Sequence, residues 1–540
     1  MTFETRRLIL AGGAALALAL AAPLASAPAE AQGKTFRWAN DGDVNSMDPY
    51  SRNETFLLAF LQNIYEPLAR RDKNLKLEPA LAAKWGQTSP TTWFFDLRQG
   101  VKFHDGTPFT ADDVVFSLNR ANGKGSNMLG YFATVKAIRK VSDFRVEVDT
   151  NVPDPLLASK WAQIFIMSKA WAEKNKAETV GDLTKNEENF ATRNAMGTGP
   201  FKLKSREPDV KTVLEANKDW WDKKVEHNLS EVVFSRIANA ATRVAALRSG
   251  EIDMVYTVPP QDTDTLAKDP NTKIIQGPET RVVYLGWDHF RDELLYSNIK
   301  GKNPFKEKRV REAIYRSIDV DAIKRTVMRG QSFPTALMVA PGINGYTKEI
   351  DKRPALLKPD QAKKMLADAG YPQGFEVTLD CPTDRYVNDE KVCQAVVGML
   401  ARIGVKVNLR AQTRLKYFAQ ILLPKADMSF FMLGWSPAAT YDVHDVFINL
   451  IQTYNPETKK GQFNPGRYSN KKFDELADKV QVETDTAKRN AMIAEATKIY
   501  TSDYAYIPLH QQAVIWAARK NVDMVQTADN SFQIRWVKLK

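Results

Sequence analysis

The stretch FEVTLDCPTDRYVNDEKVCQAVVGMLARIGVKVNL, residues 375–409, decides the fold. Its beginning, 375–379, alternates apolar and polar side chains and includes β-branched ones, which predicts a strand, and 405–409 predicts a second strand in the same way. Between them lies an apolar stripe at helical spacing, formed by Val392, Val396, Met399, Leu400 and Ile403. Asn388 can cap this helix and Gly404 can end it. Strand, helix and strand at this spacing predict a right-handed βαβ unit with parallel strands.

The sequence around this unit continues the alternation of helices and strands. Residues 358–372 are predicted to be helical, because Pro359 suits a first turn, Gly370 suits the left-handed stop and Pro372 prevents continuation. Further helices are expected at about 309–328, 470–480 and 485–500, and a strand at 506–518. The region 290–500 is therefore predicted to form an α/β lobe.

Length and charge narrow the class of protein. The chain has 540 residues, of which 44% are hydrophobic and 26% charged. Because single hydrophobic cores stop growing near ~250–300 residues, this length predicts more than one domain. The net charge is +12, from 76 basic and 64 acidic residues, and the basic residues are scattered among acidic ones. This pattern argues against a nucleic-acid partner and suits an exported protein with an acidic ligand or docking surface.

The N-terminus has the pattern of a secretory signal peptide. Arg6 and Arg7 precede the apolar run 8–22, and small residues then offer cleavage sites, of which the bond after Ala31 fits best. We therefore expect residues 1–31 to be removed and the mature chain to lie in the periplasm. A membrane anchor is the weaker alternative, because the run is shorter than the ~20 apolar residues that cross a bilayer. General and twin-arginine export both stay open.

The two cysteines of the chain are Cys381 and Cys393. Their separation is not a metal-ligand spacing, and in an oxidising compartment a disulfide is the first hypothesis. Two buried free thiols are the alternative.

The stretch LRQGVKFHDGTPFTADDVVFSLNR, residues 97–120, gathers His104, Asp105, Asp112 and Asp113. Asp105 and the glycine after it predict a turn, and Thr110 with Asp113 matches the capping box of a following helix. A metal site is the alternative, but it needs these side chains to converge on one cation, and no second histidine is near. We therefore predict a structural role, with no catalytic residue, metal or cofactor.

Extended to LAAKWGQTSPTTWFFDLRQGVKFHDGTPFTADDVVFSLNR (81–120), this stretch resembles the family 5 extracellular solute-binding proteins, the receptors of peptide and nickel ABC importers. The likeness runs in family order from about residue 35 to 510. It includes GTGPFKL (197–203), NKDWWDKK (217–224), LRSGEIDMV (247–255), NPFKEKRVREAIYRSIDVDAI (303–323), AKKMLADAGYP (362–372), GWSP (434–437) and YSNKKFDEL (468–476).

The resemblance implies an α/β fold of two lobes joined by two hinge strands, the class II or Venus-flytrap arrangement, with an extra domain inserted in the first lobe. The implied boundaries are 33–79, 195–285 and 505–540 for lobe one, 80–194 for the inserted domain and 286–504 for lobe two. The hinges are expected near 282–288 and 504–508. The solute sits between the lobes, and a membrane permease recognises the closed, monomeric protein.

The segment around GWSP also bears on the ligand. In peptide-binding relatives an arginine lies three residues before the tryptophan and an aspartate three residues after it, and that aspartate pairs with the amino group of the peptide. This sequence has Met432 and Ala438 at those places, so this amine clamp is absent. Asp442 or Asp445 is the candidate replacement. Trp435 can stack against a ligand, or alternatively belongs to the core after an apolar strand.

Further candidates for the ligand site are Arg385, Tyr386, Trp287, Asp288, Asn45 and Met47. The first two follow a predicted strand of lobe two, where α/β sheets bind ligands, and Arg385 can pair with an anion. The second two lie at an expected hinge, and the last two precede Asp48 in the other lobe. Each has a structural alternative. Arg385 would be a solvated loop residue, Trp287 a core residue and Asp288 part of a turn. Asn45 and Met47 would only form the turn before Pro49.

Two other functions compete with that of an importer component. A hydrolase fits the sequence less well, and a sensor fits it equally. A secreted hydrolase would use the near-match GWSPA (434–438), but Ala438 replaces the last glycine of a GxSxG elbow and Pro437 follows Ser436 where a helix should begin. A sensor of the same fold would partner a chemoreceptor or regulator in place of a permease, and the sequence does not separate it from an importer component. The resembled family covers peptides, opines, oligosaccharides and nickel complexes, so the resemblance names no single ligand.

Overall fold

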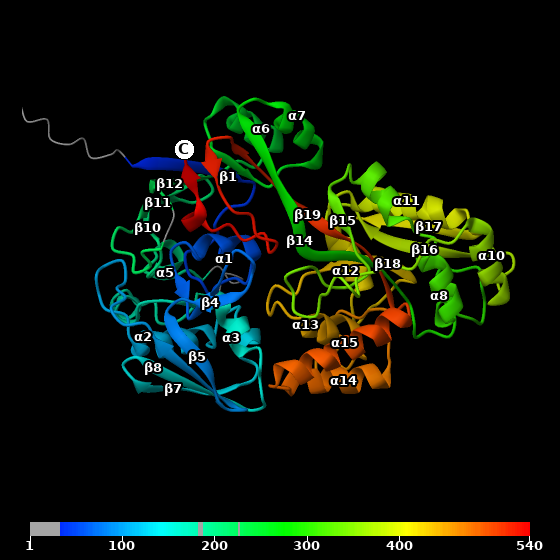
Figure 1. Cartoon of the computed structure of the whole chain (residues 1–540), viewed down its shortest axis with the longest axis horizontal. Coiled ribbons are helices and arrows are strands. Elements are labelled where there is room, and N and C mark those ends of the chain that lie inside the picture. The colour runs from blue at the N-terminus through cyan, green and yellow to red at the C-terminus, as the bar shows by residue number, and fades with distance from the viewer. Residues whose placement is uncertain (1–32, 182–186, 225–226) are drawn as a thin grey trace, which may run out of the picture.

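The computed structural model describes residues 33–181, 187–224 and 227–540, and the predicted signal peptide lies outside this range. Among these residues one sheet of 11 strands runs through the molecule (Figure 1). Its strands, in spatial order, are β10 (Phe201–Glu207), β11 (Lys211–Ala216), β12 (Leu229–Arg236), β1 (Lys34–Asn40), β13 (Met254–Tyr256), β19 (Tyr506–Arg519), β14 (Thr272–Trp287), β18 (Phe430–Trp435), β16 (Phe375–Pro382) and β17 (Val405–Gln412), with β15 (Ser332–Pro334) beside β19.

The two long central strands, β14 and β19, connect the two halves of this sheet (Figure 1). They pair antiparallel, but the register is interrupted between Pro278 and Val282. On one side of the interruption β13 pairs with β19, and on the other side β18 pairs with β14. We call the part with β1, β10–β13 and the elements packed on them lobe one, and the part with β16–β18 and its helices lobe two. The residue boundaries implied by the resemblance stay a prediction.

Lobe one carries a second, four-stranded antiparallel sheet, in the order β5 (Ala82–Ser89), β6 (Thr92–Leu97), β8 (Arg145–Thr150) and β7 (Val135–Ser142). Its helices are α1 (Thr55–Leu61), α2 (Ala111–Ala121), α3 (Leu157–Lys160), α4 (Lys169–Lys174), α5 (Phe190–Arg193), α6 (Ala240–Ser249) and α7 (Thr263–Lys268). Short strand pairs join β2 (Glu66–Pro67) to β9 (Phe165–Ile166), β3 (Ala69–Arg71) to β4 (Leu77–Pro79), and β20 (Val522–Asp523) to β21 (Lys538–Leu539). One continuous apolar core joins both sheets, from Trp38 to Phe95 and Leu118.

Lobe two contains the βαβ unit that the sequence predicts. Strands β16 and β17 pair in parallel from Phe375 opposite Val405, which confirms the prediction of parallel strands. The remaining helices are α8 (Lys308–Tyr315), α9 (Val320–Ala322), α10 (Pro359–Asp368), α11 (Asp389–Ala401), α12 (Arg414–Ile421), α13 (His444–Val446), α14 (Lys471–Val482) and α15 (Thr486–Ser502). Cys381 at the end of β16 and Cys393 on α11 form a disulfide with Cα atoms 6.6 Å apart, a usual separation.

Two local predictions for lobe two are only partly right. Asn388 stands at the N-cap position of α11, as predicted, but its side chain makes no capping hydrogen bond; it has a left-handed φ of 55°, and its amide donates to the Val327 carbonyl at 3.1 Å. The helix expected over 309–328 is broken after Tyr315 and restarts at Val320. The restart has a physical reason, because the Asp319 carboxylate accepts a hydrogen bond from the Ala322 N–H at 2.8 Å and so caps a new helix.

The region around His104 has the structural role that the sequence predicts. Gly106 has a φ of +90° in the turn, and the Thr110 N–H donates to the Asp113 carboxylate at 2.9 Å in a capping box at the start of α2. The His104 ring lies 3.1 Å from the Gly199 carbonyl, and burial lowers its pKa to about 4. Within the described residues no group of three or more His, Cys, Asp or Glu is placed to hold a metal ion, and no helix has the length and apolarity to span a membrane.

Candidate ligand-binding cleft

A cavity of about 360 Å³ lies on lobe two, beside the interrupted part of β14. We call it the arginine cavity; its walls include Arg281, Tyr284, Arg385, Tyr386, Trp435 and Ser436. It brings together three of the residues that the sequence singled out, Arg385, Tyr386 and Trp435, and adds Arg281, which sequence reasoning missed. These residues come from three segments that are far apart in the chain.

The strand order of lobe two explains why these segments meet. Strands β16 and β18 are parallel neighbours, so their carboxyl ends reach the same edge of the sheet. Arg385 and Tyr386 follow β16, and Trp435 ends β18. The Tyr386 hydroxyl accepts a hydrogen bond from the Gly434 N–H at 2.7 Å. A Cβ at position 434 would lie 2.7 Å from the Tyr386 ring, so this close approach requires the glycine.

Charged side chains meet at the edge of the cavity. Glu279 is the neighbouring carboxylate; it lies 3.5 Å from the Arg281 guanidinium and accepts a hydrogen bond from the Gln512 amide at 3.0 Å. Burial raises the pKa of Glu279, and the cations of Arg281 and Arg385 oppose that rise. The Arg385 guanidinium also lies 5.1 Å from the centre of the Tyr386 ring. Two guanidinium groups therefore lie close to Glu279 at the edge of the cavity.

The half-buried indole of Trp435 forms the aromatic wall. Its Nε1–H donates to the Asp445 carboxylate at 2.6 Å, and its ring lies 4.9 Å from that of Phe463. Burial raises the pKa of Asp445 to about 6, against the effect of the indole N–H. Asp445 thus orients Trp435, and one edge of the indole stays available to the cavity.

Four other residues proposed from the sequence lie in the interior. Asp442 forms an ion pair with Arg489 at 2.6 Å, which holds its pKa below the usual range in spite of burial. Trp287 is fully buried and donates to the Ala505 carbonyl, and Asp288 accepts from backbone N–H groups in a turn. Met47 is a core residue. These four side chains line none of the cavities described in this section, and their contact with a ligand stays a prediction. Asn45 is exposed and lines none of the three cavities described in this section.

A second cavity, of about 440 Å³, lies on the lobe-one side of the interrupted part of β14; we call it the hinge cavity. Its walls include Asp41, Arg243, Thr257, Glu279, Val387 and Gln512. Glu279 lines this cavity and contacts Arg281 of the arginine cavity, so the two cavities flank the same short stretch of β14. The one sequence signal for this stretch is a charged interruption, Glu279 to Arg281, inside a run that otherwise reads as a strand.

The segment 436–441 of lobe two bridges to lobe one. The Gln163 amide donates to the Ala438 carbonyl at 3.0 Å, and the Ser159 hydroxyl donates to the Thr440 carbonyl. The Tyr441 ring lies 3.5 Å from the Arg71 guanidinium, and its hydroxyl donates to Asp529 at 2.6 Å. A third cavity, of about 210 Å³, lies behind this segment, with walls from both lobes; we call it the inner cavity. Ala438, which stands at the place of the amine-binding aspartate, lines it.

Known proteins share this fold and sequence pattern. Residues 76–457 match the model of the bacterial extracellular solute-binding proteins, family 5. The glutathione-binding protein GsiB of Salmonella paratyphi A is 26% identical over 94% of this chain and 94% of its own length. The structure of HbpA2 from Haemophilus parasuis has a TM-score of 0.81 at 23% identity, covering 94% of this chain and all of that one. DppA from Helicobacter pylori in complex with the peptide STSA has a TM-score of 0.69 at 24% identity, covering 94% and 98%.

These likenesses confirm the α/β fold of a two-lobed binding protein. The family model spans most of the chain and includes the βαβ unit and the residues named above for the arginine cavity, from Arg281 to Ser436. The chain therefore belongs to the family 5 bacterial extracellular solute-binding proteins, the solute-capturing components of ABC importers.

Proposed function

We propose that this chain captures a small, peptide-like solute that carries a carboxylate, and that the arginine cavity binds that carboxylate. The observation that carries the proposal is the meeting of Arg281 and Arg385 beside the half-buried Trp435. A guanidinium is planar and always charged, and it pairs with a carboxylate through two parallel hydrogen bonds. Trp435 offers an apolar face for the part of the solute next to its charge.

Capture is a shift between two conformations of the lobes. The arginine cavity lies on lobe two and the hinge cavity on the lobe-one side of the same strands, so a solute between them contacts both. Such a solute stabilises the closed form by the difference in its affinity for the two forms. Moving the ratio of open to closed from 99:1 to 1:99 requires about 5.5 kcal/mol of that difference. No bond is made or broken, and we propose that the chain is not an enzyme.

The relatives support a peptide-like ligand with a carboxylate. One is named a glutathione-binding protein, and another was solved with the peptide STSA. A peptide ends in a carboxylate, the group that an arginine pair would hold. The absence of an aspartate at position 438 implies that the amino group is held differently here, or that the solute lacks one.

We also propose a partner protein, a cellular compartment and lobe boundaries for this chain. The partner is the membrane permease of an ABC transporter, and the chain acts as a monomer in the periplasm after cleavage near Ala31. The hinge segments are the interrupted part of β14 and the facing part of β19, so we propose that lobe two begins close to Val282 and ends close to Tyr506, within a few residues of the predicted boundaries.

Native mass spectrometry of the gently purified protein tests this proposal, followed by calorimetry with the co-purified solute, glutathione and short peptides. We expect a bound compound with a carboxylate. Its amide derivative should bind at least about tenfold more weakly, because a charge-assisted hydrogen bond contributes ~1.5–3 kcal/mol. Equal affinity for the acid and the amide would contradict the role of the arginine cavity.

A further inference from the structure

The inner cavity has walls from both lobes. Lobe one contributes α1, the segment Glu66–Arg71 and the C-terminal segment around Arg535, and lobe two contributes Ala438, Ala439 and Tyr441. A solute group placed there would contact both lobes, as does a solute in the cleft. The volume of about 210 Å³ is large enough for a side chain of a few heavy atoms.

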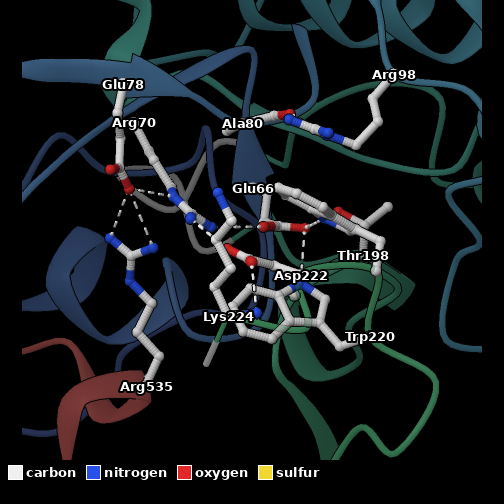
Figure 2. Close-up of polar contacts among 12 residues, drawn as sticks. Glu66, Arg70, Glu78, Ala80, Arg98, Thr198, Trp220, Asp222, Lys224 and Arg535 are labelled. Carbon is white, nitrogen blue, oxygen red and sulfur yellow. Dashed lines mark hydrogen bonds and ion pairs between the residues drawn. The ribbon is translucent and has the colours of Figure 1, made fainter. Parts of the chain in front are cut away.

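Charged residues behind this cavity form one connected network (Figure 2). Glu66 accepts hydrogen bonds at one oxygen from Thr198, Trp220 and Trp221, at 2.8–3.2 Å. Arg70 lies 3.5 Å from its other oxygen and donates to Glu78 at 2.8 Å and to Asp222 at 2.5 Å. The charge of Glu66 is thus countered by Arg70 and by three neutral donors.

Arg535 donates to the Gln533 side chain at 2.6 Å and to the Arg71 carbonyl at 3.2 Å, and it forms a longer ion pair with Glu78. Figure 2 shows its guanidinium reaching from the C-terminal segment toward Glu78, a carboxylate that Arg70 already uses. The distance from Arg535 to Glu78 is 3.4 Å, longer than that from Arg70. Burial lowers the pKa of Arg535 to about 10, and the positive charge of Arg70 adds to the effect. A further carboxylate near Arg535 would therefore be stabilised.

The polar atoms on the cavity wall have the same bias. Three arginines line it, Arg70, Arg71 and Arg535, against the two carboxylates Glu66 and Asp529. Among the described residues that line the cavity, the buried atoms Arg70 Nη1 and Glu66 Oε1 form only the 3.5 Å ion pair with each other, and Arg71 Nε has no hydrogen-bond partner. A group that brings acceptor oxygens and negative charge would offset the excess of arginines on the wall.

The arginine cavity and the inner cavity are lined by one continuous segment of chain. Gly434 to Ser436 line the arginine cavity, and Ala438 to Tyr441 include the wall of the inner cavity. Ser436 and Ala438 are two residues apart, which corresponds to at most ~7 Å of extended chain. One short solute lying along this segment can therefore place a group in each cavity.

We propose that the inner cavity is a second subsite of the same binding site, which takes a carboxylate-bearing side chain of the solute through Arg535, Arg70 and Arg71. This inference rests on the proposed function and makes it more specific, because it assigns the solute two carboxylates. Arg535 is the specificity-determining residue: it lies at the cavity, and its ion-pair partner Glu78 is shared with Arg70.

The test compares acidic peptides with their amide counterparts by calorimetry on the full mature chain. The probes are Ala-Glu with Ala-Gln, and Glu-Ala with Gln-Ala, which differ only by one side-chain carboxylate. We expect the wild type to prefer the acidic member of at least one pair by about tenfold or more. In the variant Arg535→Gln this preference should fall to less than about twofold, while the amide peptide binds as before.

Two controls separate charge from structure. Arg535→Lys should keep most of the preference, because it keeps the positive charge. Arg98→Gln removes a positive charge that is drawn in the same network but lies outside the cavity wall, and it should leave the preference unchanged (Figure 2).

Equal affinity of the wild type for both members of both pairs would overturn the second subsite, and this outcome needs no variant. A full preference retained in Arg535→Gln would overturn it as well. If the peptides bind with no preference, only this inference fails; if neither acidic nor amide peptides bind, the proposed peptide-like ligand fails and this inference fails with it.

Discussion

The charged residues around His104 and those around Arg385 look alike in the sequence but differ in what they contact. Around His104 the polar groups are used by the backbone: Asp113 caps α2, and the His104 ring meets the Gly199 carbonyl, 95 residues away. Around Arg385 the charges come from two distant segments, Glu279 and Arg281 on β14 and Arg385 after β16, and meet at a cavity. Charge that caps a helix or fills a turn stabilises the fold, whereas charge that lines a cavity beside the strands joining the lobes is placed to contact a ligand.

The strongest test of this difference removes the guanidinium of Arg385. We expect Arg385→Ala to lower solute affinity by about tenfold to a hundredfold, because a charge-assisted hydrogen bond of ~1.5–3 kcal/mol is lost. Its unfolding free energy should change by less than about 0.5 kcal/mol. Calorimetry with the co-purified solute and chemical denaturation measure the two quantities. Arg402→Ala, an exposed arginine on the same lobe, is the matched control, and an equal loss in both variants would remove Arg385 from the site.

A second test removes the aromatic wall. We expect Trp435→Ala to weaken solute binding by more than about tenfold, since the indole edge that lines the cavity is lost, with little effect on the stability of the ligand-free protein. Unchanged affinity in calorimetry would show that Trp435 only supports the lobe. Trp287→Phe is the contrasting variant, because Trp287 is a core residue, and it should alter stability and leave affinity unchanged.

The pH dependence of stability tests the structural role of His104. Its folded pKa of about 4 lies below the ordinary value of 6.5, so the unfolded chain binds more protons between these two pH values. Stability from this group is therefore present above about pH 6.5 and is lost as the pH falls toward 4, by at most ~1.4 kcal/mol per pH unit for one proton. We expect His104→Gln to reduce the slope of unfolding free energy against pH in this window. A slope equal to that of the wild type would contradict burial of the neutral ring.

The smallest expected effect concerns the capping box. Asp113→Ala removes the acceptor for the Thr110 and Lys169 N–H groups and should cost about 1 kcal/mol of unfolding free energy. Solute affinity should stay within about twofold of the wild type. A large loss of affinity with normal stability would reverse the distinction between the two charged regions.

Local patterns made part of this structure predictable. The βαβ unit, the helix cap at Thr110, the helix start at Pro359 and the turn at Gly106 depend on neighbouring residues, and the structure has them. The break after Tyr315 was missed because the apolar stripe of Val310, Ile314 and Ile318 continues across it, while the capping by Asp319 is a weaker signal in the sequence.

The site was predictable only where it follows strand ends. Arg385 and Trp435 follow the edges of neighbouring parallel strands, a rule that the sequence supports. Arg281 and Glu279 were missed because their exposure to the cavities comes from the interrupted pairing of β14 with β19, more than 200 residues away. The burial of Trp287 was not predicted, since it depends on stacking against Phe430 and contact with Phe305, which no local pattern specifies.

The most direct test of the central claim is a crystal structure of the protein with its co-purified solute. The account predicts that the solute lies between the lobes, with a carboxylate within hydrogen-bond distance of Arg385 or Arg281 and its apolar part against Trp435, and that lobe one contacts its other side. A solute bound outside the arginine cavity, or held by one lobe alone, would contradict it.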